Sequence, residues 1–153
     1  MRHRITAVTD ISLDDLYHRG IKSILLDLDN TIIVWDESKV PPAIRQWIQR
    51  GKKNGFMFCL LSNSYTSRAK RIATELDIPV VAPALKPLPF GYWRAMKLLK
   101  ATAPNTVMVG DQLFTDMLGA HLLKINTIYV TPLSTTEFCL TRISRCLERL
   151  VWK

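Results

Sequence analysis

Residues 24–31 read ILLDLDNT, and the interpretation of the whole chain starts from them. An apolar run ends there on two aspartates one residue apart, Asp27 and Asp29, and continues with Asn30 and Thr31. The whole segment 21–29 is typical of a strand whose sheet is covered on both faces. A buried strand that ends on two carboxylates needs partners for them, because an unpaired buried charge is costly. The stretch therefore predicts a central strand with a functional site at its end.

Length and composition indicate one soluble domain that spans residues 1–153. The chain is 48% apolar and 22% charged, which is ordinary for a globular protein. Its longest strongly apolar stretch, FMFCLL at 56–61, is far shorter than the roughly 20 residues of a membrane span, so no integral membrane segment is expected. The N-terminus lacks the apolar region of a secretory signal, and the three cysteines share no metal-ligand spacing. These features favour a cytoplasmic location.

The net charge of +8 is the unusual bulk property. Such a balance favours polyanionic partners: nucleic acid, an anionic membrane surface or a phosphorylated substrate. A simple surplus of surface charge that keeps the protein soluble is the alternative, and charge alone does not separate these options.

Short apolar runs alternate with helical patterns along the chain. Strands are expected over residues 21–29, 55–63, 78–83, 105–111 and 125–130. Helices are expected over residues 12–19, 41–53, 64–76, 90–101 and 114–123, followed by a last helix from Ser134 towards Trp152. Five buried strands separated by helices predict an α/β fold built on a parallel sheet.

Polar side chains gather where the expected strands end. Besides Asp27 and Asp29, the group comprises Ser62 and Asn63 after the second strand, Lys86 after the third, and Gly110, Asp111 and Asp116 at and after the fourth. In open parallel sheets the ligand crevice lies outside these carboxyl ends. The sequence therefore predicts that the group forms one site.

The residue types in this group suit phosphoryl transfer. Asp27 and Asp29, two apart in an extended segment, are expected on one face, and clustered acids need a cation to stay ionised together. Carboxylate oxygens suit Mg²⁺, which also binds substrate phosphate. The hydroxyls of Thr31 and Ser62 and the Lys86 ammonium suit phosphoryl oxygens. One carboxylate can attack phosphorus while a second transfers a proton.

Four segments taken together resemble the motifs of the haloacid dehalogenase superfamily of phosphatases. They are DLDNT (27–31), LLSNS (60–64), LKP (85–87) and GDQLFTD (110–116). The chain is most similar to the small YqeG-type branch, subfamily IIIA, which is phosphatidylglycerophosphatase-like. The resemblance runs from about residue 20 to residue 148. It implies a Rossmann-like three-layer sandwich with five parallel strands in the order 3-2-1-4-5 and a minimal cap or none.

The resemblance also implies a role for each motif residue. By position, Asp27 is the nucleophile and a Mg²⁺ ligand, while Asp29 is the general acid and base and binds the metal through its backbone carbonyl. Thr31, Ser62 and the backbone N–H of Asn63 serve the phosphoryl group, and Lys86 neutralises charge on nucleophile and phosphate. Asp111 is a direct metal ligand, and Asp116 binds through water or supports the other ligands.

The spacing of the motifs leaves no room for a cap, so the site is expected to be open. Only 30 residues separate Thr31 from Ser62, and 23 separate Ser62 from Lys86. An open site suits a phosphate carried by something large. The C-terminal helix, about residues 135–152, is expected to be basic and amphipathic, and it either lies on an anionic membrane or packs on the sheet.

The resemblance implies that the substrate is phosphatidylglycerophosphate, reached by peripheral binding at the inner membrane surface. Two alternatives remain open at this stage. One is a phosphatase for nucleic acid ends or phosphoproteins, and the other is a non-catalytic binding module with the same fold. A receiver domain is disfavoured, because its acceptor aspartate normally follows the third strand, where this chain reads VVAPALKP.

Overall fold

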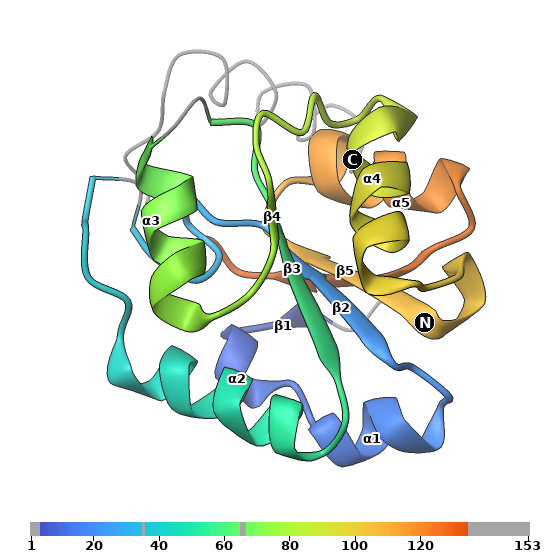
Figure 1. Ribbon diagram of the computed structural model, residues 1–153, viewed down its shortest axis with the longest axis horizontal. Coiled ribbons are helices and arrows are strands. Elements are labelled where there is room, and N and C mark those ends of the chain that lie inside the picture. Colours follow the sequence, from blue (N-terminus) through green and yellow to red (C-terminus); the bar gives the residue numbers. More distant parts are fainter. Residues whose placement is uncertain (1–3, 35, 65–66, 135–153) are drawn as a thin grey trace.

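A single parallel sheet of six strands organises the molecule, seen in a computed structural model that describes residues 4–34, 36–64 and 67–134. The strand order is β1-β6-β5-β2-β3-β4 (Figure 1). The strands are β1 (Arg4–Ile5), β2 (Ser23–Leu26), β3 (Met57–Leu61), β4 (Val80–Val81), β5 (Thr106–Gly110) and β6 (Asn126–Val130). The order of the last five, β4-β3-β2-β5-β6, is the predicted 3-2-1-4-5, so the expected fold class is confirmed.

Strand β2 lies at the centre of the sheet, as ILLDLDNT predicted. Leu25 pairs with Cys59 of β3 on one side and with Met108 of β5 on the other. All four residues of β2 are buried, which explains why the segment lacks the polar alternation of a strand with one wet face. Its carboxyl end is therefore flanked by the ends of β3 and β5, where the other motif residues lie.

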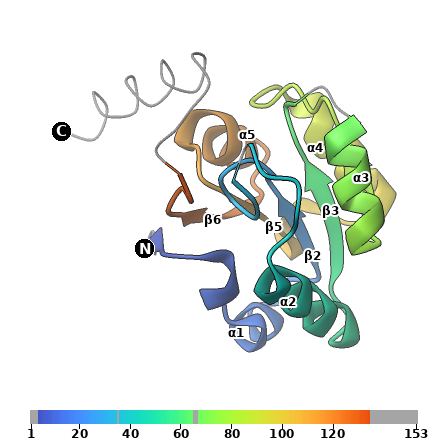
Figure 2. The same cartoon turned by 90° about the vertical axis from the view of Figure 1, so that its left-hand side faces the viewer.

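Helices cover both faces of the sheet and make three layers (Figures 1 and 2). The helices are α1 (Leu13–His18), α2 (Pro42–Lys53), α3 (Ser67–Leu76), α4 (Pro89–Leu99) and α5 (Leu118–Leu122). Alternate strand residues serve separate cores: Ile24 and Leu26 face the layer of α1, α2 and α3, whereas Leu25 faces the layer of α4 and α5. This period of two is what a strand buried on both sides requires.

The edge strand β1 was not predicted. It contains only Arg4 and Ile5, paired with Tyr129 and Val130 of β6, and so short a segment has no alternation to detect. Strand β2 also ends earlier than expected. It stops at Leu26, and Asn30 adopts a left-handed backbone conformation with φ 60°, so Asp27 and Asp29 lie in the loop beyond the strand.

Helices α1, α2, α3 and α4 begin and end within three residues of the predicted positions. Ser12 caps α1 by accepting a hydrogen bond from the Asp15 backbone N–H at 3.2 Å. Helix α2 begins at Pro42, and proline suits the first turn because the backbone N–H that it lacks would have no partner within the helix there. The helix expected at 114–123 is instead a π-helical turn, η3 (Leu113–Met117), continued by α5. Two 3₁₀ turns, η1 (Val8–Asp10) and η2 (Ala103–Asn105), complete the elements. The predicted C-terminal helix lies outside the described residues.

None of the helices in the described part of the chain has the length and apolar character that a membrane crossing requires.

Candidate active site

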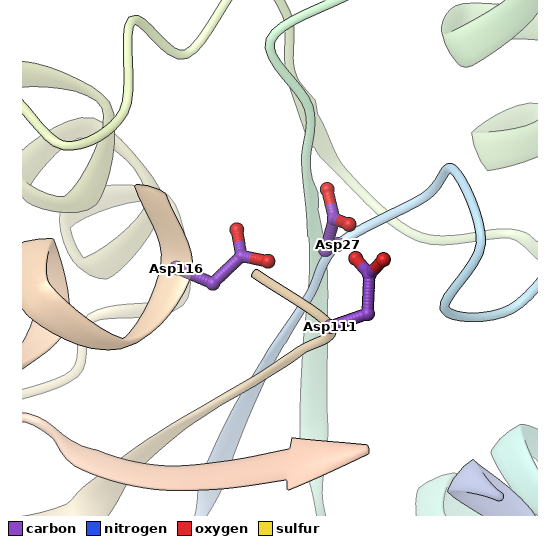
Figure 3. A group of neighbouring side chains, drawn as sticks. All are labelled: Asp27, Asp111 and Asp116. Carbon is purple, nitrogen blue, oxygen red and sulfur yellow. The ribbon is translucent and has the colours of Figure 1, made fainter. Parts of the chain in front are cut away.

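Three carboxylates converge beyond the carboxyl ends of the two central strands (Figure 3). Asp27 follows β2, Asp111 follows β5, and Asp116 comes from η3. One oxygen of each lies within 4.8 Å of one oxygen of both others. All three residues are buried, and Asp111 and Asp116 are fully so. The neighbouring positions of β2 and β5 in the sheet therefore bring together acids that stand 84 positions apart in the sequence.

Thr31 and Lys86 connect these acids to one another. The Thr31 hydroxyl lies 3.1 Å from Asp27 Oδ2 and 3.1 Å from Asp111 Oδ1. The Lys86 ammonium donates to Asp27 Oδ1 at 2.8 Å and to Asp116 Oδ1 at 2.6 Å. Of the predicted site residues, these five form one connected and buried cluster, which we call the acidic centre.

The acidic centre carries more negative than positive charge. It gathers three carboxylates around one ammonium, and all four of these residues are buried. Burial, and then the neighbouring charge of Asp27, raise the pKa of Asp116 to about 7. Burial opposes the charge on Lys86, but attraction to Asp116 and Asp27 outweighs it and raises the pKa of this ammonium above its ordinary value. The donor set therefore fits a divalent cation that prefers oxygen ligands.

Tyr92 and Gly110 shape the turn that carries Asp116. The Tyr92 hydroxyl of α4 donates to the backbone carbonyls of Thr115 at 2.6 Å and Asp116 at 3.1 Å, which holds the wide turn of η3 in place. Gly110 leaves room for the carboxylate, since a Cβ there would lie 2.3 Å from Asp116 Oδ2. The same oxygen, Asp116 Oδ2, accepts a hydrogen bond from the Gln112 backbone N–H at 3.1 Å.

Asp29 has different partners from Asp27. Its carboxylate accepts a hydrogen bond from the Ser64 hydroxyl at 2.6 Å and pairs with the Arg68 guanidinium of α3. Its side chain is 27% exposed, against 9% for Asp27. The two aspartates therefore do not lie on one face of an extended strand, as the sequence predicted, because both lie past the end of β2. The carboxylate of Asp29 is not a member of the acidic centre.

The same guanidinium also holds the loop that follows Thr31. Arg68 donates to the backbone carbonyl of Val34 at 3.1 Å and to that of Glu37 at 2.9 Å. Helix α3, through Arg68, therefore fixes both Asp29 and the loop that begins with the motif DLDNT.

Ser62 and Asn63 support the strand end beside the acidic centre. Ser62 is buried, and its Oγ accepts a hydrogen bond from the Ser64 backbone N–H at 3.1 Å. The Asn63 side chain bonds both backbone groups of Lys86, accepting from its N–H at 2.7 Å and donating to its carbonyl at 3.0 Å. These two hydrogen bonds fix the Lys86 backbone at the position from which its side chain reaches the carboxylates of the acidic centre.

Arg68 and Tyr92 were not identified as site residues from the sequence. Each acts through a contact between segments distant along the chain, so no local pattern marks it. Gly110 was placed in the predicted group by its position at the strand end, but the room that it leaves for Asp116 was not predicted.

The comparisons with known proteins agree with this geometry. A family model for haloacid dehalogenase-like hydrolases matches residues 5–123, and the chain belongs to that family. The chain is 33% identical over 141 residues to the probable phosphatase YqeG of Bacillus subtilis, which covers 92% of this chain and 82% of that protein. The predicted class, a phosphatase of the haloacid dehalogenase type, is thereby confirmed.

A second relative is more distant. The chain is 28% identical over 136 residues to phosphatidylglycerophosphate phosphatase 1 of Arabidopsis thaliana, a chloroplastic and mitochondrial protein, and it spans only 39% of that protein's length.

Solved structures share the fold. An uncharacterised protein from Listeria monocytogenes superposes with a TM-score of 0.60 at 18% identity, over 86% of this chain and 99% of that one. The cobalt-bound deoxy-D-mannose-octulosonate 8-phosphate phosphatase of Haemophilus influenzae gives a TM-score of 0.54 at 17% identity, over 61% and 60% of the two chains. At these identities the likeness shows the architecture alone.

Proposed function

We propose that this chain hydrolyses phosphomonoesters with the help of Mg²⁺, through a phosphoaspartate formed on Asp27. The observation that carries the proposal is the acidic centre, in which three buried carboxylates and one ammonium surround a single point at the strand ends. Three carboxylates around one ammonium are more acids than a single structural ion pair uses. A divalent cation would neutralise the clustered carboxylates, and the cation together with the ammonium would offset the negative charge of a transferring phosphoryl group.

The metal would be held by Asp27 and Asp111, with Asp116 as a ligand through water or as a support, and with the backbone carbonyl of Asp29 as the further predicted ligand. When bound, Mg²⁺ would supply charge neutralisation to the phosphoryl oxygens. Thr31 hydrogen bonds to both Asp27 and Asp111, so it keeps these two carboxylates at a fixed separation.

The reaction proceeds in two halves on residues of this chain. A carboxylate oxygen of Asp27 forms a bond to phosphorus while the bond from phosphorus to the leaving oxygen breaks, and Asp29 gives that oxygen a proton. Asp29 then takes a proton from water, the water oxygen bonds to phosphorus, and the bond to Asp27 breaks. Lys86 offsets charge on Asp27 throughout, and Ser62 with the Asn63 backbone N–H binds phosphoryl oxygens.

The chemistry is tested with 4-nitrophenyl phosphate in the presence of Mg²⁺. Wild type is expected to release nitrophenol, while Asp27→Asn loses more than 1,000-fold in rate, about the size of effect of removing a catalytic nucleophile. Asn keeps the shape of the side chain, so thermal unfolding serves as the control for folding. Equal rates for the two proteins would show that Asp27 is not the nucleophile.

For the substrate, we propose phosphatidylglycerophosphate at an anionic membrane surface. The relative from Arabidopsis thaliana carries that activity in its name. The described residues between β2 and β3 form loops and one helix, α2, and those between β3 and Lys86 form α3 and β4, so these described segments contain no cap domain, which suits a large phosphate carrier. The charge of +8 favours an anionic surface.

The substrate is tested by comparing phosphate release from three carriers under the same conditions. They are phosphatidylglycerophosphate in mixed micelles, an oligonucleotide with a 5′-phosphate and a phosphoserine peptide, each with Asp27→Asn as the blank. The lipid is expected to give the highest kcat/KM. A higher value for the oligonucleotide or the peptide would replace the lipid, and no release from any carrier or from the aryl phosphate would indicate a binding module.

A further inference from the structure

We propose that the outer face of α4 and the loop leading into it, which carries Lys86 of the acidic centre, dock the protein on an anionic lipid surface. This docking surface consists of Leu85, Leu88, Phe90, Trp93, Arg94 and Lys97. The inference rests on the proposed lipid substrate and adds the surface by which the chain reaches it.

The docking surface exposes large apolar side chains beside the site. Leu85 is 53% exposed and Leu88 51%, and they stand on either side of the segment that begins with Lys86 of the acidic centre. Phe90 is 56% exposed and Trp93 51%, and their rings meet edge to face with centroids 5.8 Å apart. Four such side chains next to one another form an apolar patch of the kind that marks an interaction site.

Basic side chains continue the same helix face. Phe90, Trp93, Arg94 and Lys97 follow the spacing i, i+3, i+4 and i+7, which places them along one side of α4, and all four are exposed. Aromatic and apolar residues combined with Arg and Lys on one helix face are typical of helices that lie in the interface of an anionic membrane.

The charged residues of the whole α4–α5 layer also favour an anionic lipid surface as the partner. Between residues 78 and 134 the only acids are Asp111 and Asp116, which are fully buried, so every exposed charged side chain of the segment is basic. The exposed acids of the described residues all precede Ile78; they are Asp10, Asp14, Asp15, Asp36, Glu37, Glu75 and Asp77. Figure 1 shows α4 and α5 together on the side of the sheet opposite α3.

Two other occupants suit the docking surface less well. A second copy of the chain that shares this surface through a twofold axis would bring both copies of Arg94 and Lys97 into one interface, and such like charges repel. Single-stranded nucleic acid binds through basic grooves and aromatic stacking, which gives the exposed Leu85 and Leu88 no role. A lipid surface accounts for the apolar and the basic members alike.

The orientation follows from the position of Lys86. This residue precedes α4, and its side chain reaches Asp27 from the loop that also exposes Leu85 and Leu88. A membrane that receives Leu85 and Leu88 therefore lies next to the loop that carries Lys86 of the acidic centre. A phosphomonoester on a lipid head group would approach from that side.

The experiment is flotation of the full chain with vesicles of equal parts phosphatidylcholine and phosphatidylglycerol, compared with vesicles of phosphatidylcholine alone. Wild type is expected to float with the anionic vesicles only. Asp27→Asn is expected to float equally, since binding does not depend on the nucleophile. A failed phosphatase assay therefore leaves this measurement intact, and a failed flotation leaves the phosphatase proposal intact.

Paired variants test the docking surface itself. Arg94→Gln with Lys97→Gln is expected to weaken partitioning about 30-fold, from the usual contribution of a basic residue at an anionic surface. Phe90→Ala with Trp93→Ala is expected to weaken it at least about tenfold through lost apolar burial.

The matched control is Arg50→Gln with Lys53→Gln, which removes two exposed basic residues from α2 in the other layer. It is expected to change partitioning less than about threefold, because α2 faces away from the membrane. If the α2 pair weakened vesicle binding as much as the α4 pair does, the effect would come from net charge alone and the proposal would be overturned. The proposal would also be overturned if both α4 double variants bound the vesicles as wild type does. It would be overturned as well if wild type did not float but self-associated or bound an oligonucleotide.

Discussion

The lysine of the acidic centre offers the sharpest test of its charge balance. Lys86→Met keeps the length of the side chain and removes the ammonium that lies 2.8 Å from Asp27 Oδ1 and 2.6 Å from Asp116 Oδ1. The Lys86 side chain is 2% exposed, so water does not replace the lost charge. In the metal-free protein the variant leaves three buried carboxylates facing one another.

The expected loss of unfolding free energy is about 3–5 kcal/mol at pH 8, the range observed when one partner of a buried ion pair is removed. The loss is expected to be smaller near pH 5.5, where Asp116 takes up a proton. The pKa of Asp116 is raised to about 7 in the folded wild type, and losing Lys86 raises it further. A carboxyl group with a raised folded pKa binds more protons in the folded state, so stability falls as pH rises above about 4 towards that pKa.

The assay is urea unfolding of wild type and Lys86→Met at both pH values, with a chelator present to remove divalent metal. Lys70→Met is the matched control, because Lys70 is exposed on α3 and its replacement is expected to cost less than about 0.5 kcal/mol. A loss below 1 kcal/mol at pH 8, or a larger loss at pH 5.5 than at pH 8, would refute the charge balance described for the acidic centre.

Three further outcomes follow from the site. Asp29→Asn is expected to slow hydrolysis of an alkyl phosphate at least tenfold more than that of 4-nitrophenyl phosphate, whose leaving group needs no proton; an equal loss on both substrates would argue against a proton donor. Mg²⁺ is expected to bind more tightly at about pH 8 than at about pH 5.5 and to release protons when it binds, because the pKa of Asp116 is raised to about 7. Titration calorimetry at the two values checks this, and equal affinities would contradict it. Gly110→Ala is expected to lower the unfolding free energy by about 1–3 kcal/mol, since its Cβ would overlap Asp116, and calorimetric melting measures the loss.

The sheet and the acidic centre were predictable because their signals are local. Each predicted strand is an apolar run, and the first four are followed within a few residues by the polar groups of the site. The strand order came from the resemblance of four motifs rather than from periodicity, which cannot tell which strands are neighbours. Once β2 and β5 are placed side by side, Asp27 and Asp111 must meet, and the structure brings them together.

What the sequence did not predict depends on contacts across the fold. Strand β1 exists because Arg4 and Ile5 complete the edge of β6, and two residues carry no pattern of their own. The wide turn of η3 depends on the Tyr92 hydroxyl from α4, which bonds carbonyls that a regular helix would use internally. Helical periodicity alone therefore placed a continuous helix where the chain makes a π-helical turn.

Asp27 and Asp29 are anchored by different partners, and different work is proposed for them. A nucleophile must meet phosphorus at one fixed point, and Asp27 is held by Lys86 and Thr31 inside the buried acidic centre. A proton donor must serve a leaving group and afterwards a water molecule. Asp29 is partly exposed and is held from α3 by Arg68, outside the acidic centre. Two aspartates one residue apart can divide these tasks only because the strand ends before both of them, which frees each carboxylate to find its own partners.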